Sequence, residues 1–575
     1  MSRRRARILA VIGLLGLVAA CTREAERPVI DLLQHVPADT PYAFVTSKHL
    51  PAGLRDKLAD HYAAQLAAQG AAFARLRGQV EASDDTAPMA RQARQLFDVL
   101  DALFAEFEGR GTAARVRELG IEPVTRTVFY GIGLLPAARV EIADAAKLNA
   151  MLDRVEQRAG VTASRGELNG QSYRRIDLGK VDAVLAVSDR HAVGGLLADA
   201  LFERDLPLLL GQAQPSHNLA DAGDIGALIE RHGFTGYGEG FIKLDELIDM
   251  LLGNGQGRNA QVMQALGAQP LPISEGCMRM TRELAAGMPR LVMGVTAADA
   301  THLAARGIWE STPAVATYLQ KLAAPVPGVG SPYDGLLAVG LGIDLPQLRN
   351  AIDALLRRVI AAGSGCEWVD PDSLQAVIPQ LNLALGPMTA GIKGFNLQIE
   401  DLTVDPDTLQ PTSVRAALLA AVDDPRGIFA LGAMFNPSLA ALQIPEDGSF
   451  VDLPQGLGLD QQTPPLQVAI RDRALLLLAG AESADLAQPL LSAVAASPAP
   501  LFAIDYGIYR LVQRFGDLLD AAAGRLSGQG EDEMAAELRD QMAGFRQQAE
   551  LYDRLRVSVH ASAEGLVMDQ VMELR

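Results

Sequence analysis

The stretch PRLVMGVTAADATHLAARGIWE at residues 289–310 has a counterpart in DRLRVSVHASAEGLVMDQVMEL at residues 553–574, and the two align without a gap. In each, apolar and polar residues alternate on both sides of a short polar tip, which is the pattern of two antiparallel strands joined by a turn. Arg290 lies opposite Arg554 in this alignment. A repeated hairpin predicts that a larger unit occurs twice in the chain.

Earlier segments repeat in the same order. Residues 40–51, TPYAFVTSKHLP, resemble residues 331–346, SPYDGLLAVGLGIDLP, and both precede an amphipathic segment. The dipeptide at 169–170, Asn-Gly, has a partner in the Asp-Gly at 447–448. Such dipeptides favour tight turns between strands, because both residues tolerate positive φ. The alternative is chance similarity between Ala- and Leu-rich segments, which the paired Pro-Tyr and Gly turns argue against.

Two acidic residues also recur in the repeat. The matching segments GFIKLDELIDML and LFAIDYGIYRLV place Asp245 opposite Asp505, and each lies within or at the end of a short apolar strand. We expect both carboxylates to cap the helices that follow, because an acidic side chain can accept hydrogen bonds from the free N–H groups of a first helical turn. A duplicated catalytic acid is the alternative interpretation.

The repeat predicts an α+β fold with two tandem copies of one unit, each a meandering antiparallel sheet with helices packed on one face. The units span residues 36–310 and 331–575, and the first carries a helical insertion at about 51–118. Residues 311–330 are interpreted as a short helix and a linker, the linker being APVPGVG at 324–330. Hairpin connections argue against a doubly wound α/β fold.

The N-terminus has the features of an export signal. It reads MSRRRARILAVIGLLGLVAAC, with four arginines before an uncharged apolar run at 8–20. A membrane-spanning helix needs about 20 apolar residues, so this run is short for a span and fits the core of a signal peptide. The alternative is a buried N-terminal helix with an incidental cysteine.

The end of this run, LVAAC, resembles the lipobox of bacterial lipoproteins. The resemblance implies that residues 1–20 are removed, that Cys21 becomes the lipidated first residue, and that 21–35 form a tether. Two or three acyl chains anchor a protein stably to a membrane. Thr22 follows the cysteine where aspartate is typical of inner-membrane retention, so the resemblance places the protein at the outer membrane, facing the periplasm.

Composition limits the partners. The formal net charge is −18, and removal of the leader takes away four further positive charges, so the body is strongly acidic. Binding to nucleic acid needs clustered lysine and arginine, and we therefore expect no nucleic-acid partner. Cys277 and Cys366 are the cysteines beyond Cys21, and in an oxidising periplasm we expect them to form a disulfide. Two buried free thiols are the alternative.

Motifs for catalysis and cofactors are missing from the sequence. It contains no complete GxGxxG, no GxxxxGK[ST], no HExxH, no GxSxG and no SxxK. The eight histidines are scattered singly. Acidic pairs such as 84–85, 423–424 and 531–533 fit helix starts and solvated turns better than a glycosidase site. We predict no catalytic, cofactor-binding or metal-binding residues and no enzymatic activity.

The body also resembles a group of bacterial envelope proteins. The phrase HVPADTPYAFV at 35–45, the Asn-Gly hairpin and the closing alternating hairpin are similar to proteobacterial lipoproteins that carry a domain of unknown function. The contexts of the two body cysteines, SEGCMRMTRELAAGMPRL and GSGCEW, are similar as well. The resemblance implies localisation in the cell envelope, and it brings no activity or catalytic residues with it.

The sequence thus predicts a membrane-anchored periplasmic lipoprotein that acts as a non-enzymatic binding or scaffold protein for another envelope protein. One alternative is a carrier of lipid or another apolar ligand, since curved sheets with helices on one face can enclose an aliphatic site. The other alternative is a hydrolase of envelope polymers, which only the expected location favours.

Overall fold

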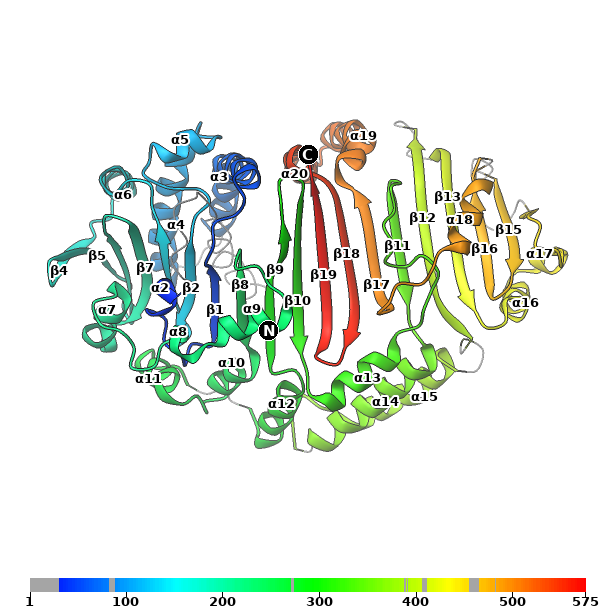
Figure 1. Ribbon diagram of the computed structural model, residues 1–575, viewed down its shortest axis with the longest axis horizontal. Coiled ribbons are helices and arrows are strands. Elements are labelled where there is room, and N and C mark those ends of the chain that lie inside the picture. The colour runs from blue at the N-terminus through cyan, green and yellow to red at the C-terminus, as the bar shows by residue number, and fades with distance from the viewer. Residues whose placement is uncertain are drawn as a thin grey trace. The chain divides into compact units, whose positions relative to one another are not determined.

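The structure is a computed structural model, and it describes residues 30–81, 88–269, 273–363, 365–386, 389, 391–405, 411–454, 465–480 and 482–575. The predicted leader at 1–20 and the predicted lipidation site, Cys21, lie outside the described residues. The chain divides into two compact units: unit 1 is Met1–Pro272 with Arg290–His302, and unit 2 is Ile273–Pro289 with Leu303–Arg575. Figure 1 shows the helices and strands of both units.

Unit 1 contains one antiparallel sheet with the strand order β4-β5-β6-β7-β3-β2-β1-β8-β9. The strands are β1 (Tyr42–Thr46), β2 (Thr127–Ile132), β3 (Leu135–Glu141), β4 (Ser164–Leu168), β5 (Gln171–Asp177), β6 (Val181–Val187), β7 (His191–Ala198), β8 (Glu239–Lys243) and β9 (Arg290–Ala298).

The helices of unit 1 fall before, between and after these strands. Those inside the predicted helical stretch 51–118 are α3 (Ala52–Glu81), α4 (Pro88–Phe107) and α5 (Ala113–Arg117). The others are α2 (Ile30–Leu33), α6 (Ala145–Ala159), η2 (Asp199–Leu201), α7 (Phe202–Leu210), α8 (Leu219–Ala222), α9 (Asp224–His232), α10 (Leu244–Leu251) and α11 (Gly257–Ala265). The local sequence determines where helix α6 begins and ends. Asp144 caps its first turn by accepting from Lys147 N, and Gly160 ends it in the left-handed region.

In unit 2 the strands lie in the order β14-β15-β16-β13-β12-β11-β17-β18-β19-β10. Because the strand pairings in each unit are antiparallel and helices separate the hairpins, the predicted α+β class is confirmed. The strands are β10 (His302–Glu310), β11 (Leu337–Gly342), β12 (Ile392–Val404), β13 (Pro411–Val422), β14 (Val451–Asp452), β15 (Leu466–Arg471), β16 (Ala474–Ala479), β17 (Pro500–Gly507), β18 (Tyr552–Ser562) and β19 (Gly565–Leu574).

The helices of unit 2 gather mainly beyond the two ends of the strands (Figure 1). Several begin with an aspartate cap followed by proline, and Asp344 accepts from Gln347 N in this way. The helices are α12 (Glu275–Gly287), α13 (Pro313–Leu322), α14 (Leu345–Ala362), α15 (Pro371–Ala384), α16 (Pro425–Phe435), α17 (Pro437–Ala440), η3 (Ala484–Leu486), α18 (Ala487–Ser492), α19 (Ile508–Gly528) and α20 (Asp532–Leu551).

Tight turns set the registers of several hairpins. Asn169 and Gly170 both have positive φ, 46° and 83°, and join β4 to β5 as the sequence predicts. The turn from β15 to β16 is likewise two residues long, with Asp472 at φ 49°. The predicted Asp-Gly turn at 447–448 does not join paired strands; it precedes the short β14, which pairs with β15.

The segment expected to be a linker lies inside unit 2. Residues 324–330 cross strand β11, with Val326 and Val329 each 2% exposed. A Cβ added to Gly340 would lie 2.5 Å from a methyl carbon of Val329, so the glycine makes room for this segment. We call residues 324–330 the strap. Its Pro- and Gly-rich composition is typical of linkers, but the two valines between them enter the hydrophobic core.

Neither of the two recurring acids is the N-cap residue of the helix that follows it. Asp505 lies inside β17, is 3% exposed, and is separated from α19 by Tyr506 and Gly507. Asp245 lies in the first turn of α10, where its Oδ1 accepts from Glu246 N at 2.9 Å. The expected capping role is therefore wrong for Asp505, because its carboxylate is engaged by arginines of the neighbouring strand.

Unit 1 contains one buried carboxyl group with an unusual pKa. Glu239, at the start of β8, is 1% exposed, and its Oε1 accepts from Gly236 N at 2.6 Å. Burial raises the pKa of this carboxyl to about 7, although N–H groups of the Gly236–Gly238 turn act in the opposite direction. The group therefore changes charge near neutral pH while it is inside the sheet.

Replacing Glu239 with glutamine should stabilise the protein at alkaline pH. The folded pKa lies above the unfolded value of 4.5, so the stability from this group is complete below pH 4.5 and is lost as the pH rises through 7. We expect the free energy of unfolding of E239Q to exceed that of the wild type by about 3 kcal/mol at pH 8, and by about 1 kcal/mol at pH 5. Urea unfolding at both pH values measures this. The exposed Glu167→Gln is the control, and a gap that does not vary with pH would contradict the assignment.

Candidate functional site

The strands of unit 2 present two faces of different character. Because side chains alternate along a strand, residues in register with Ala338 share one face and residues in register with Val339 share the other. The first face carries Asn396 and Asp505 and lies under the strap, so we call it the strap face. We call the second the apolar face.

The strap face is packed. Leu419 and Leu476 are fully buried on it, and Leu490 of α18 belongs to the same hydrophobic cluster. Val326 and Val329 of the strap complete this cluster. Figure 1 shows α18 crossing β13 and β16, in keeping with its contacts to β13. The core of unit 2 therefore lies between the sheet, the strap and α18.

The apolar face is uncharged over six neighbouring strands, β16, β13, β12, β11, β17 and β18. At the paired positions on this face no charged side chain occurs among the described residues. Its larger side chains are all partly exposed, and they are Leu337, Val339, Leu341, Phe395, Leu397, Ile399, Leu418, Leu475, Leu477, Phe502, Ile504, Tyr506, Leu555, Val557 and Val559.

This arrangement departs from ordinary antiparallel sheets. When one face is packed, the other is usually polar and solvated. Here the second face carries leucine, isoleucine, valine and phenylalanine at positions that solvent reaches. Large exposed apolar surfaces are unfavourable in a soluble body unless they serve an interaction. The apolar face of unit 2 is therefore the candidate functional site.

The corresponding face of unit 1 has less apolar side-chain surface. Positions 131, 194 and 240 on its central strands are glycine. Tyr42 and Phe129 stack on this face with their ring centroids 5.6 Å apart. Partly exposed aliphatic side chains, Ile242 and Leu291 among them, lie on it as well. The aliphatic surface is therefore wider in unit 2, but it is not confined to that unit.

A buried charge cluster lies on the strap face. Asp505 accepts from Arg554 Nη1 at 2.6 Å, from Arg556 Nε at 3.0 Å and from Tyr333 N at 2.9 Å. Arg554 also donates to the carbonyl of Gly335 at 2.6 Å. With its hydrogen-bonding positions occupied in this way, Asp505 joins β17, β18 and the segment after the strap, and it is not available as a catalytic acid.

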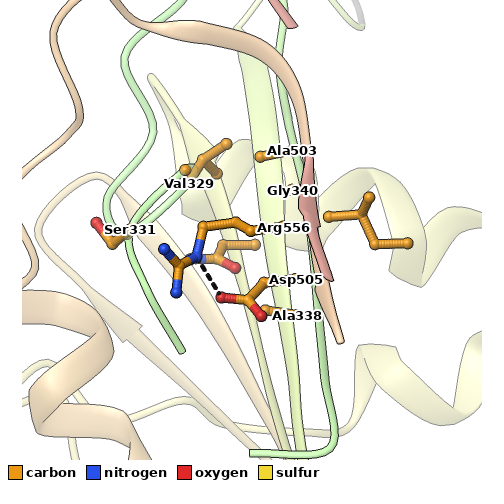
Figure 2. A pocket seen from close by; sticks show the side chains of 11 residues that line it. Val329, Ser331, Ala338, Gly340, Ala503, Asp505 and Arg556 are labelled. Carbon is orange, nitrogen blue, oxygen red and sulfur yellow. Dashed lines mark hydrogen bonds and ion pairs between the residues drawn. The ribbon is translucent and has the colours of Figure 1, made fainter. Parts of the chain in front are cut away.

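A cavity beside this cluster is very small. Figure 2 shows Asp505 and Arg556 at its wall, together with Ser331 and Gly340. Its volume is about 10 Å³. A single water molecule needs about 10–15 Å³, so this cavity is too small for any organic substrate.

A helical hairpin forms a second surface feature of unit 2. Neither α14 nor α15 has a buried residue, and Leu355, Trp368 and Leu383 are 51%, 58% and 80% exposed. A groove of about 530 Å³ lies between the two helices. It is lined by Arg357, Ile360, Ala361, Gln375, Ile378 and Pro379. Because the groove is open and its helices are thinly packed, it is a weaker candidate than the sheet face.

The two body cysteines form the predicted disulfide, with an S–S distance of 1.94 Å. Cys277 lies in α12 and Cys366 lies between α14 and α15, so the bond connects α12 to the helical hairpin. Glu367 has a carboxylate oxygen 3.3 Å from Cys277 Sγ. These three residues are the one cluster of potential metal ligands among the described residues, and the disulfide uses both sulfurs.

Histidine and acidic groups occur in local structural arrangements. His302 Nδ1 lies 2.8 Å from Thr301 Oγ1, and Asp299 accepts from the hydroxyl and backbone N–H of Thr301 in the same exposed turn. These hydrogen bonds lower the pKa of Asp299 to about 2. Burial lowers the pKa of His49, whose acidic neighbour Glu141 is already paired with Arg126.

The acidic pairs have structural roles where they are described. Asp423 pairs with Arg473 and Lys393, and Asp424 caps α16 by accepting from Gly427 N. The acids at 531–533 lie at the start of α20, and the pair at 84–85 lies outside the described residues.

Among the described residues, no helix is long and apolar enough to cross a membrane. No protein-family model, no curated protein and no solved structure matches this chain.

Removing the Asp505 carboxylate should destabilise unit 2 strongly. Asp505→Ala leaves Arg554 buried without its carboxylate, and breaking a buried pair from one side costs about 3–5 kcal/mol. Asp401→Ala is the matched control, because Asp401 pairs with Arg514 where both side chains are about half exposed, and such pairs contribute about 0–1 kcal/mol. Urea unfolding of both variants measures the difference. Similar losses of stability in the two variants would show that the pair of Asp505 with Arg554 contributes no more than an exposed ion pair.

Breaking the disulfide should loosen the helical hairpin selectively. Because α14 and α15 bury no residue, their position depends on the disulfide bond to α12. The position of strands β11–β13 depends on this bond less. We expect reductant, or Cys277→Ala with Cys366→Ala, to accelerate hydrogen exchange in 345–384 at least tenfold and to lower stability by about 2–4 kcal/mol. Reductant should not affect the double variant further. Equal acceleration in β11–β13 would contradict this local effect.

Proposed function

We propose that the protein is a membrane-anchored lipoprotein of the cell envelope that acts as a non-enzymatic binding protein, with the apolar face of unit 2 as its binding surface. The observation that carries the proposal is the partly exposed face without charge across six strands. Surfaces of this kind are typical of interaction sites. A carrier of lipid or another apolar ligand is the second candidate, favoured by the same absence of charge.

The anchor and the location rest on the N-terminal sequence. The arginines before the apolar run, the small residues before Cys21 and the threonine after it support a leader of residues 1–20, lipidation, and the outer membrane facing the periplasm. The Cys277–Cys366 disulfide is in keeping with an oxidising compartment. Membership of the envelope lipoproteins with a PADTP-like phrase belongs to the same proposal. No feature of the described residues favours a hydrolase.

We also propose that the two units arose by duplication. Strands β5-β6-β7-β3-β2-β1-β8-β9 of unit 1 follow the same spatial order as β14-β15-β16-β13-β12-β11-β17-β18 of unit 2. Lys243 pairs with Arg290, as Gly507 pairs with Arg554, and a helix follows each of these two strand ends. In this register the counterpart of Asp505 is Phe241, which differs from the pairing with Asp245 expected from sequence.

The anchor is tested by replacing the lipidated residue. With Cys21→Ala, we expect loss of labelling by a palmitate analogue and release of the protein, or of its precursor, from the membrane fraction. The control is Cys277→Ala with Cys366→Ala, which should remain labelled because those cysteines form the disulfide. A labelled Cys21→Ala chain would refute the assignment of this residue.

The binding surface is tested by photocrosslinking in cells. A photoreactive amino acid at Val557, on the apolar face, should give a specific adduct, whereas the same group at the neighbouring Ser558, on the strap face, should not. Both positions are partly exposed, so access to solvent does not explain a difference. Equal adducts at both positions, or none at either, would overturn the proposed surface.

A further inference from the structure

We infer that the occupant of the apolar face is a single membrane phospholipid whose acyl chains lie along the strands of unit 2. The inference rests on the proposed function and names its ligand. It starts from complementarity of charge: the chain carries a net charge of −18, yet the face carries none across six strands. An occupant that covers the face must therefore be uncharged over the same area.

The hydrogen-bonding capacity of the face is equally restricted. The backbone groups of β12, β11 and β17 are paired within the sheet, because each of these strands has a neighbour on both sides. The hydroxyl of Tyr506 is the one polar side-chain group among the large residues of the face. A protein interface normally makes about one hydrogen bond per 100–200 Å² of buried surface. This face cannot supply such bonds, whereas acyl chains need none.

The composition of the face points in the same direction. Protein interaction surfaces are enriched in tyrosine, tryptophan and arginine. The apolar face has leucine, isoleucine and valine at most of its positions, and it has neither tryptophan nor arginine at its paired positions. Flexible methylene chains pack well on such an aliphatic surface, because they can follow the ridges and grooves between the strands.

The dimensions of the face fit a two-chain lipid. Six strands with a spacing of about 4.8 Å give a width of about 24 Å, and the positions from Leu337 to Leu341 span about 13 Å along the strand. A bilayer core is about 30 Å thick, so one acyl chain spans about 15 Å. Two chains side by side therefore match the length of the face and fit within its width.

The test uses the full chain with Cys21→Ala, so that any lipid found belongs to the body and not to the anchor. The probe is a phosphatidylethanolamine with a diazirine on one acyl chain, supplied in vesicles of phosphatidylethanolamine and phosphatidylglycerol. After irradiation, vesicles are removed and the soluble protein is analysed by mass spectrometry. We expect about one labelled lipid per chain, attached to peptides from β11, β12, β17 and β18.

A pair of charge variants tests the face directly. Leu397→Lys with Val557→Lys introduces two charges on the apolar face and should reduce labelling at least tenfold. The matched control, Gln398→Lys with Ser558→Lys, introduces the same charges one residue along each strand, on the strap face, and should keep at least half of the labelling. Thermal unfolding checks that both variants are folded. If a variant does not fold, the map of labelled peptides in the Cys21→Ala chain still tests the inference.

Each other outcome overturns the lipid assignment in a distinct way. Labelling of α14 and α15 in place of the strands would assign the lipid to the helical groove. Labelling only of vesicle-bound protein would make the face a docking surface for the membrane itself. Absence of lipid together with a protein adduct at Val557 would overturn this inference and leave the proposed binding function intact. Absence of both the lipid and the protein adduct would overturn this inference and the proposed binding function together.

Discussion

Side chains of a β-strand alternate between two faces, so a sheet with apolar residues at successive positions has two surfaces to remove from water. Unit 2 meets this constraint on one face only. The strap and α18 cover Leu419 and Leu476, whereas Leu397 and Leu418 on the opposite face remain partly exposed. Each apolar Å² left in water forgoes about 25 cal/mol of stabilisation. A ligand that covers the second face recovers this free energy on binding. The exposure of the face therefore supplies the driving force for its proposed binding function.

The strap face contains a buried charge cluster, Asp505 with Arg554 and Arg556, beside its aliphatic core, and the position of Asp505 is fixed by its partners. Asp505 is satisfied by two arginines of β18 and by the backbone of Tyr333. Those bonds connect the end of β17 to the segment that follows the strap. A misplaced strap would leave the carboxylate without one of these donors, and a buried polar group without partners is costly. The charge cluster therefore specifies where the strap lies.

Much of the secondary structure could be predicted from the sequence. The Asn169 turn, the helices within 51–118 and the pairing of Cys277 with Cys366 follow from local signals, namely positive-φ residues, helical periodicity and cysteine count. The strap could not be predicted, because a Pro- and Gly-rich segment looks the same whether its valines are buried or exposed. The role of Asp505 was also missed, since its arginine partners lie far along the chain and only the strand register brings them together.

The candidate site could not be recognised from the sequence for a similar reason. Segments such as LLAVGLG and LFAIDY are nearly continuous apolar runs, and periodicity alone cannot show which of two apolar faces is covered. The sequence signal for the apolar face is the absence of polar residues at alternate positions in β11, β12 and β17. That signal is also expected for a strand buried on both faces. Only the arrangement of the covering segments distinguishes the two cases.

The acidity of the chain acts together with the proposed anchor. A lipid anchor at Cys21 would keep the body near the membrane and raise the local concentration of phospholipid around it. The net negative charge opposes adsorption of the body onto an anionic bilayer through its own surface. Anchoring then brings the apolar face close to lipid, while charge repulsion prevents that face from lying permanently on the bilayer. A lipid that leaves the membrane to occupy the face satisfies both conditions, whereas a face built only to adhere to the membrane would gain from positive charge at its rim.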